Sequence, residues 1–207
     1  MPSVKPPSLR AEQAAQTRRR ILDAAARVLE RQGFAGTRID DVAIEAGVAV
    51  PTVYKGFTNK VNLLIGAVTL TMAGDDAAPT DQQAWFIEQL DEPDPVRQLH
   101  LIARNARRMY ERVGQLLNVL RAAAPLDTDL ARAWHDIAAQ RLDRSRRTAK
   151  NLTAKAPARL RLSRDDTALT LLALTEPELY TTYTAGNRTA AQYEAWLADL
   201  LCRALLN

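Results

Sequence analysis

The sequence predicts an all-α protein in which a small N-terminal helical domain precedes a larger helical domain. Its 207 residues are rich in Ala, Leu and Arg, include only 8 Gly and are 5% aromatic, a composition that favours helices over strands. Apolar residues recur at the spacing of a helix face, and glycine or proline separates the resulting segments. The 47% apolar content is enough for a buried core.

The first helix is expected over residues 17–32 and follows an arm over residues 1–16. The arm is basic, carries Pro2, Pro6 and Pro7 and has no apolar stretch, so we expect it to be flexible and to be neither a signal peptide nor an anchor. Gly33 lies where a C-terminal cap is expected. The helix has one apolar stripe, formed by Ile21, Leu22, Ala25, Val28 and Leu29.

Three shorter helices are expected next. Thr37 is a suitable N-cap for a helix over residues 38–46, which Gly47 would end. Another helix begins near Val50, with a proline in its first turn. Asn59 would cap the fourth helix, which ends near Gly74.

The C-terminal part is expected to be helical throughout, with prolines between its segments. The last segment has a wide apolar face, which must pack on its own core, on a partner, or on both. The predicted helices cover residues 81–90, 94–112, 113–124, 127–155, 164–185 with a kink at Pro177, and 190–206. The apolar face of the last helix consists of Tyr193, Trp196, Leu197, Leu200, Leu201, Ala204 and Leu205.

All the excess positive charge lies in the first 60 residues. They hold 10 Lys and Arg against 6 Asp and Glu, whereas the rest of the chain holds 18 of each kind. A basic segment beside a neutral one is typical of a nucleic-acid-binding domain joined to a domain with another role, although a small excess also arises by chance. The single Cys202 fits a reducing cytoplasm, and no apolar run approaches the roughly 20 residues that span a bilayer.

Residues 39–56 have the layout of a helix-turn-helix. Ala43 is small where the second helix crosses close by, and Gly47 stands at the turn, where a positive φ is needed. Val42, Val48 and Val53 supply the apolar contacts that fix the angle between the two helices. The second helix then projects Val50, Thr52, Lys55 and their neighbours outward, towards a major groove.

This region resembles the DNA-binding domain of the TetR/AcrR family of bacterial transcriptional regulators. The resemblance covers about 50 residues, and its matches in register include the first helix and the Tyr-x-x-Phe-x-x-Lys run that follows the turn. The matching residues are Arg19, Phe34, Thr37, Ile39, Val42, Ala43, Ala46, Gly47, Val48, Thr52, Val53, Tyr54, Phe57, Lys60 and Leu64. Two positions depart from the family pattern, Ala49 where Ser is usual and Val61 where an acidic residue is common.

The resemblance implies roles for the matching residues. Thr37, Tyr54 and Lys60 would contact phosphates, while Thr52 and Lys55 would face base edges. Arg18, Arg19 and Arg20 would add backbone or minor-groove contacts, with a merely solvated helix face as the alternative. The full set expected to contact DNA is Thr37, Arg38, Val50, Pro51, Thr52, Tyr54, Lys55 and Lys60.

The resemblance also implies that the C-terminal helices form a ligand pocket and a homodimer interface. The apolar face from Tyr193 to Leu205 is the expected interface. We expect a hydrophobic effector, because the candidate pocket residues are the large or amphipathic side chains of the middle helices. These are Trp85, Phe86, Met109, Tyr110, Leu117, Trp134, His135 and Tyr180, and plain core packing is the alternative for each.

The predicted organisation is therefore an arm (1–16), a helix-turn-helix domain (17–60) and a helical effector-binding and dimerisation domain (61–207). We expect a cytoplasmic, ligand-released repressor that binds a pseudo-palindromic operator in double-stranded DNA as a dimer, without membrane contact. Isolated His100 and His135 provide no metal spacing, and no nucleophile or phosphate-loop motif occurs, so no enzyme activity, metal or cofactor is expected. The alternatives are an effector-independent or activating regulator of the same fold, and a helical small-molecule-binding protein with a vestigial DNA-binding domain.

Overall fold

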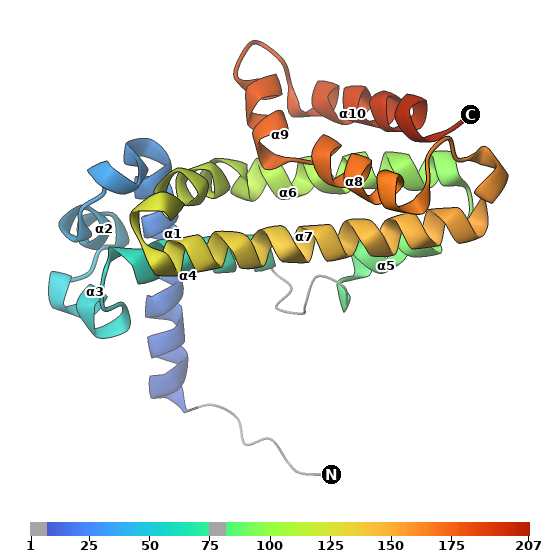
Figure 1. Ribbon diagram of the computed structural model, residues 1–207. Helices are drawn as coiled ribbons and strands as arrows, with labels where there is room; N and C mark the ends of the chain where they lie inside the picture. Colours follow the sequence, from blue (N-terminus) through green and yellow to red (C-terminus); the bar gives the residue numbers. More distant parts are fainter. Residues whose placement is uncertain (1–7, 75–81) are drawn as a thin grey trace, which may run out of the picture. The chain divides into compact units, whose positions relative to one another are not determined.

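The computed structural model describes residues 8–74 and 82–207 and confirms the all-α prediction (Figure 1). Over these residues the chain has no named strand, and its extended pairing is an isolated antiparallel bridge between Leu160 and Leu206. None of the described helices combines the length and the apolar character needed to cross a membrane. The chain divides into two compact units, Met1–Thr71 and Met72–Asn207, and the division lies inside the fourth helix, whereas the predicted domain boundary lies at residue 60.

The first unit contains α1 (Leu9–Gly36), α2 (Ile39–Ala46), α3 (Val50–Gly56) and α4 (Lys60–Ala73). The predicted start of the first helix at residue 17 is wrong, and so is a flexible arm beyond Ser8. The Ser8 hydroxyl accepts a hydrogen bond from the Ala11 amide and caps α1. The following residues are mostly strong helix formers, so the helix extends to the cap. Residues 1–7 of the predicted arm lie outside the described residues.

Helix α4 packs closely on α1 around Gly66. A Cβ atom at this position would lie 2.8 Å from Cδ2 of Leu22, closer than carbon atoms approach one another. The core of the unit is formed by Ile21, Leu22, Ala24, Ala25, Val28, Leu29, Val42, Ala43, Ala46, Val53, Phe57, Leu63, Leu64, Ala67 and Val68. The predicted apolar stripe of the first helix is therefore buried, as its spacing indicates.

The turn between α2 and α3 depends on Gly47. Its φ of 63° and ψ of 42° are left-handed, which confirms the predicted positive φ. Its amide donates to the Ile44 carbonyl, and the Val48 amide donates to the Ala43 carbonyl, so the last carbonyls of α2 are satisfied. A Cβ at Gly47 would also lie 3.3 Å from Nη2 of Arg20.

Two arginines of α1 hold the ends of α2 and α3. Arg20 Nη2 donates to the Ala46 carbonyl at 2.7 Å, and Arg18 Nη1 donates to the Gly56 carbonyl at 3.0 Å. The Arg18 guanidinium also lies 4.2 Å from the centre of the Phe57 ring. These contacts fix the orientation of both short helices on α1.

The second unit contains α5 (Ala84–Asp91), α6 (Pro95–Ala123), α7 (Thr128–Lys155), α8 (Arg164–Leu174), α9 (Pro177–Thr184) and α10 (Ala190–Leu205). Short 3-10 turns at Ala124–Leu126 and Pro157–Arg159 precede and follow α7. The predicted break at residues 112–113 is wrong, because the segment has no proline and its apolar face continues through Val113, Leu116, Leu117 and Leu120. The single helix predicted over 164–185 is instead two helices, since Pro177 begins a new one.

Helices α6 and α7 run side by side, with α8 packed on α7 and α10 packed on α6 (Figure 1). Their shared core is made of Leu99, Ile102, Ala103, Ala149, Leu152, Ala168, Leu171, Tyr193, Leu197, Ala198, Leu201, Leu205 and Leu206. The end of the chain is fixed to the segment after α7, because the Asn207 amide donates to the Arg159 carbonyl and the Arg161 amide donates to the Leu205 carbonyl.

Arg141 of α7 joins α7 to the break between α8 and α9. Its side chain is only 8% exposed, and its Nη1 donates to both carboxylate oxygens of Glu176, at 2.8 and 2.9 Å. Its Nη2 donates to the carbonyls of Leu172 and Thr175, which have no amide partner at the end of α8. One guanidinium therefore caps a helix and pairs with the residue that begins the next.

We predict that Gly47→Ala lowers the free energy of unfolding by about 1–2 kcal/mol, because a side chain disfavours the left-handed conformation. Chemical denaturation followed by circular dichroism measures the change. Gly56→Ala is the matched control, since no atom lies within 4 Å of its Cβ position and its φ is not positive. An equal loss in both variants would contradict this role for Gly47.

We predict that Arg141→Met lowers the free energy of unfolding by about 2–3 kcal/mol, because it removes the charge pair of a buried arginine and leaves the Leu172 carbonyl at the end of α8 without a donor. Arg121→Met is the control: it breaks the exposed pair between Arg121 and Glu178, and we expect a change below about 1 kcal/mol. Denaturant titrations of both variants give the comparison. Similar losses would show that burial of Arg141 is unimportant.

Candidate functional site

The outer face of α3 carries polar side chains on a buried anchor. Val53 and Phe57 are buried in the core of the first unit, so the opposite side of the helix faces solvent. Tyr54 is 54% exposed there, although aromatic residues are usually buried. Pro51 and Lys55 are exposed as well, while Val50 and Thr52 are half-buried. Tyr54, Pro51 and Lys55 of the residues expected to contact DNA are thus exposed on α3.

Thr37 lies elsewhere than the predicted N-cap position. The N-cap of α2 is Arg38, which makes no side-chain capping bond, and Thr37 instead caps the end of α1. The Thr37 amide and hydroxyl both donate to the Gly33 carbonyl, at 3.2 and 2.7 Å, and the residue is buried. Gly33 has a positive φ of 68°, which turns its carbonyl towards Thr37. Both Thr37 donors predicted for a phosphate are therefore engaged within the chain.

Lys60 also binds the end of α1. Its ammonium group donates to the carbonyls of Thr37, at 3.1 Å, and Ala35, at 3.4 Å. It also lies 4.5 Å from the centre of the Phe34 ring. An ammonium group has three donors, so one donor of Lys60 remains beyond these two bonds. As predicted, Asn59 caps α4, its side chain accepting from the Asn62 amide.

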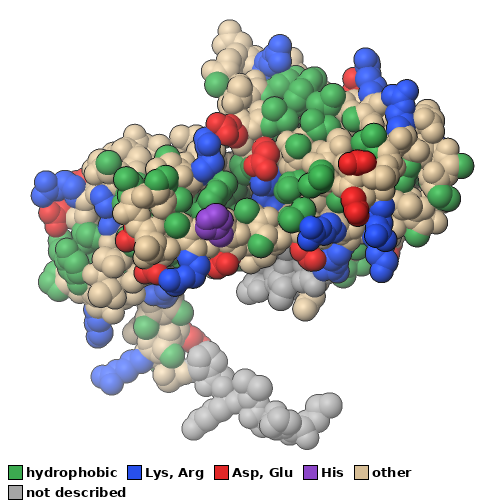
Figure 2. Space-filling model, viewed as in Figure 1, with side chains coloured by type: hydrophobic (Ala, Val, Ile, Leu, Met, Phe, Trp, Pro, Cys, Tyr) green, Lys and Arg blue, Asp and Glu red, His purple; other side chains and the backbone are tan. Residues whose placement is uncertain are grey.

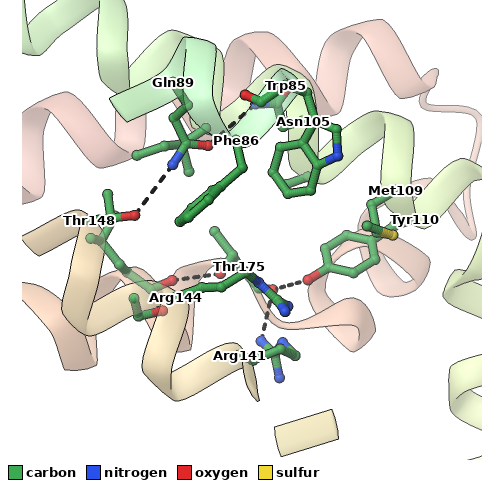
Figure 3. A pocket seen from close by; sticks show the side chains of 14 residues that line it. Trp85, Phe86, Gln89, Asn105, Met109, Tyr110, Arg141, Arg144, Thr148 and Thr175 are labelled. Carbon is green, nitrogen blue, oxygen red and sulfur yellow. Dashed lines mark hydrogen bonds between the residues drawn. The ribbon is translucent and has the colours of Figure 1, made fainter. Parts of the chain in front are cut away.

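A cavity of about 90 Å³ lies in the second unit between α5, α6, α7 and α8 (Figure 3). Four predicted pocket residues line it: Trp85, Phe86, Met109 and Tyr110. The other lining residues are Gln89, Ile102, Asn105, Ala106, Arg141, Arg144, Ser145, Thr148, Leu171 and Thr175.

The other predicted pocket residues lie outside this cavity. Leu117 is buried in the apolar face of α6, and His135 is exposed. Trp134, like His135, precedes the stretch of α7 that lines the cavity, which begins at Arg141. Tyr180 packs its ring against Tyr193, with the ring centres 4.9 Å apart, and so belongs to the aromatic cluster of α9 and α10.

The polar residues of the lining were not predicted, because the candidate pocket residues were chosen as large or amphipathic side chains. Its sequence signal is on α7, where Arg141, Arg144, Ser145 and Thr148 follow one another at the spacing of a single helix face. The same helix buries Ala149 and Leu152, so a polar stripe directed at the core is unusual and marks a site.

Most polar groups of the lining are bound to one another. Asn105 Nδ2 donates to Gln89 Oε1, and Gln89 Nε2 donates to Thr148 Oγ1, both at 3.3 Å. Burial raises the pKa of Tyr110, so its hydroxyl stays protonated and donates to the Thr175 carbonyl at 2.5 Å. Arg141 is engaged by Glu176 and the same carbonyl. These bonds hold the wall of the cavity in place (Figure 3).

The residues predicted to form the dimer interface on α10 lie in two different environments. Tyr193, Leu197, Leu201 and Leu205 are fully buried within the chain's own core, so the expectation that they contact a partner is corrected. Trp196, Leu200 and Ala204 of the same predicted face are only partly buried.

Aromatic packing extends this partly buried surface to α9. The Trp196 ring stacks on Tyr183, with 4.8 Å between the ring centres. Hydrophobic side chains gather on the face of the second unit where α9 and α10 lie (Figure 2). An apolar surface of this kind on a terminal helix is typical of a protein–protein contact.

The part of the chain that the structure describes contains no candidate metal-binding site. No group of three or more His, Cys, Asp and Glu side chains there is arranged to hold a metal ion.

The sequence of the first unit matches a family model described as "Bacterial regulatory proteins, tetR family", over residues 21–67. The chain is also similar to the HTH-type transcriptional repressor KstR of Mycobacterium tuberculosis, at 37% identity over 76 residues. That match covers 37% of this chain and 34% of the relative, so the chain aligns with about a third of the relative's length.

Solved structures match over almost the whole chain. NalD, a secondary repressor of a multidrug efflux pump in Pseudomonas aeruginosa, has a TM-score of 0.69 at 22% identity and covers 95% of this chain and 98% of its own. A regulator from Saccharomonospora viridis in complex with choline has a TM-score of 0.73 at 19% identity, covering 93% and 99%. FadR from Bacillus subtilis with stearoyl-CoA has a TM-score of 0.69 at 17% identity, covering 90% and 98%. At these identities the structures establish the fold, and the family match establishes the N-terminal domain. Residues 21–67 of the chain thus match the tetR family of bacterial regulatory proteins, and the chain as a whole has the fold of these solved regulators.

Proposed function

We propose that this protein is a transcriptional repressor that binds operator DNA as a homodimer and releases it when a small molecule enters the cavity of the second unit. The observation that carries the proposal is the exposed polar face of α3, in which Tyr54 and Lys55 point away from the buried anchor of Val53 and Phe57. A tyrosine and a lysine held outward on a fixed helix suit contacts with phosphates and base edges. This role places the protein in the cytoplasm.

We assign the DNA contacts to those predicted residues whose side chains are at least partly exposed to solvent. Tyr54 and Arg38 would bind phosphates, and Lys55 and Thr52 would reach the major groove beside Val50 and Pro51. Thr37 has a structural role in this assignment, because its donors are engaged by Gly33. Lys60 mainly secures the end of α1 and offers its remaining donor to a phosphate.

The homodimer would form through the partly buried face of α10. Trp196, Leu200 and Ala204 are the residues of the predicted face that remain for a partner, together with Tyr183 of α9. Two-fold symmetry matches a pseudo-palindromic operator, whose half-sites lie about 34–36 Å apart, one turn of DNA.

The cavity between α5, α6, α7 and α8 would bind the effector. Its polar and apolar lining is typical of a small-molecule site. The ligands named for FadR and for the Saccharomonospora viridis regulator support a ligand-responsive protein of this fold. The effector would act by favouring a conformation in which the spacing of the two α3 helices of the dimer no longer matches the half-sites of the operator.

We predict tight, salt-dependent binding to DNA that flanks the gene, and weaker binding to a scrambled duplex. Tyr54→Phe and Lys55→Ala are each expected to weaken operator binding about tenfold or more, since each removes a contact with a charged group or a base. Fluorescence anisotropy at several salt concentrations measures the affinities.

Lys150→Ala is the control for the DNA experiment, because it removes an exposed positive charge of the second unit. Its operator affinity should equal that of the unchanged protein. Equal, weak binding of both duplexes by the unchanged protein, repeated with DNA fragments selected from the whole genome, would instead support a small-molecule-binding protein with a vestigial DNA-binding domain.

We predict that Leu200→Glu converts the dimer to a monomer, because the charge would be buried at the contact between two copies. Light scattering coupled to size exclusion measures the mass. Asp199→Gln, on the neighbouring exposed position, is expected to remain dimeric. A variant that keeps its melting temperature and remains a dimer would place the interface elsewhere.

A further inference from the structure

Arg144 is a partly buried cation that lines the cavity without a partner of its own. Over residues 8–74 and 82–207, its guanidinium takes part in no hydrogen bond or ion pair with the protein. Burial lowers the pKa of Arg144, and the nearby positive charge of Arg141 acts in the same direction. An arginine nevertheless keeps its proton, so the cavity contains a charge whose compensation is incomplete.

The charges around the cavity do not balance. Arg141 and Arg144 both line it, and none of the described lining residues is acidic. Glu176 lies next to the lining, but both of its carboxylate oxygens accept from Arg141. Asp143 favours the charged form of Arg144, but its side chain is exposed and lies outside the lining. The cavity therefore has one positive charge that is only partly compensated, and this charge belongs to Arg144.

The Arg144 side chain points into the cavity, so its charge faces the space that a ligand would occupy. The side chain of Arg144 extends from α7 into the space bordered by Phe86 and Tyr110 (Figure 3). Apolar side chains of Phe86, Ile102 and Leu171 form walls nearby. Asn105 Oδ1 is buried without a hydrogen-bond partner in the described residues, and an acceptor of this kind repels an anion. An anionic group would thus lie at Arg144 and not at Asn105.

We propose that the effector is a small carboxylic acid whose carboxylate is bound by Arg144 and whose apolar body packs against Phe86, Ile102 and Leu171. A guanidinium binds a carboxylate through two parallel hydrogen bonds, and the low polarity of the cavity strengthens the pair. One incompletely compensated charge matches a carboxylate, whereas a phosphate dianion would need more than one. This inference specifies the ligand class of the site and rests on the proposed effector role of the cavity.

Pairs of probe molecules that differ only in charge test the proposal. Titration calorimetry of the full chain would compare phenylacetate with phenylacetamide and octanoate with octanamide, and phenyl phosphate would be a separate probe. We expect at least one carboxylate to bind about tenfold or more tightly than its amide. Arg144→Met should abolish that preference, and Arg144→Lys should retain part of it, because lysine keeps the charge without the two-pronged geometry.

Arg146→Met is the matched control, since it removes an exposed arginine from the same helix and should leave the preference unchanged. Unliganded Arg144→Met should melt at or above the temperature of the unchanged protein, because a poorly compensated charge is lost. A large fall in melting temperature would make Arg144 a structural residue and overturn the proposal.

Three further outcomes would overturn the assignment: no carboxylate binding up to millimolar concentration, equal binding of acid and amide, and tighter binding of phenyl phosphate than of the carboxylates. These outcomes are separate from a failure of the proposed function. The calorimetric preference requires no DNA, so a protein that prefers carboxylates but does not bind DNA would retain this inference and lose the regulatory role. A protein that binds its operator without preferring carboxylates would retain the regulatory role and lose this inference.

Discussion

The last carbonyl groups of a helix have no amide partner in their own helix, and at several helix ends this chain supplies donors from arginine and lysine side chains. Arg20 binds the end of α2, and Arg18 binds the end of α3. Lys155 binds the carbonyls of Leu90 and Glu92 at the end of α5. Arg141 does the same for α8. Because these donors come from other helices, each cap also fixes how two helices pack.

This use of cations relates the fold to the candidate sites. In the first unit, the caps hold α2 and α3 on α1, so the outward direction of Tyr54 and Lys55 follows from contacts on the opposite side. In the second unit, Arg141 is engaged by a helix end and by Glu176. Arg144, one turn further along α7, has no comparable engagement among the described residues. The contrast between these two arginines distinguishes a structural group from one available to a ligand.

The sequence predicted correctly those structural features that depend on interactions between residues close together in the chain. The helix-turn-helix, its left-handed glycine and the Asn59 cap all depend on residues within a few positions of one another, and each was predicted correctly. Thr37 was misplaced because its choice between capping α1 and capping α2 depends on the orientation of the Gly33 carbonyl. Pocket residues were only half predicted, since large apolar side chains serve equally well in a core and in a cavity.

The sequence alone determined the helical class, the helix-turn-helix and the polar residues that α3 exposes, because helix periodicity and turn chemistry are properties of short segments. Only the tertiary structure decided which side of the last helix is buried in the chain's own core and which stays partly exposed, since both sides are apolar. It likewise decided that Arg141 is paired and Arg144 is not. The two arginines are three positions apart on one helix face, and their difference arises from Glu176 and the end of α8, which folding brings to one of them and not to the other.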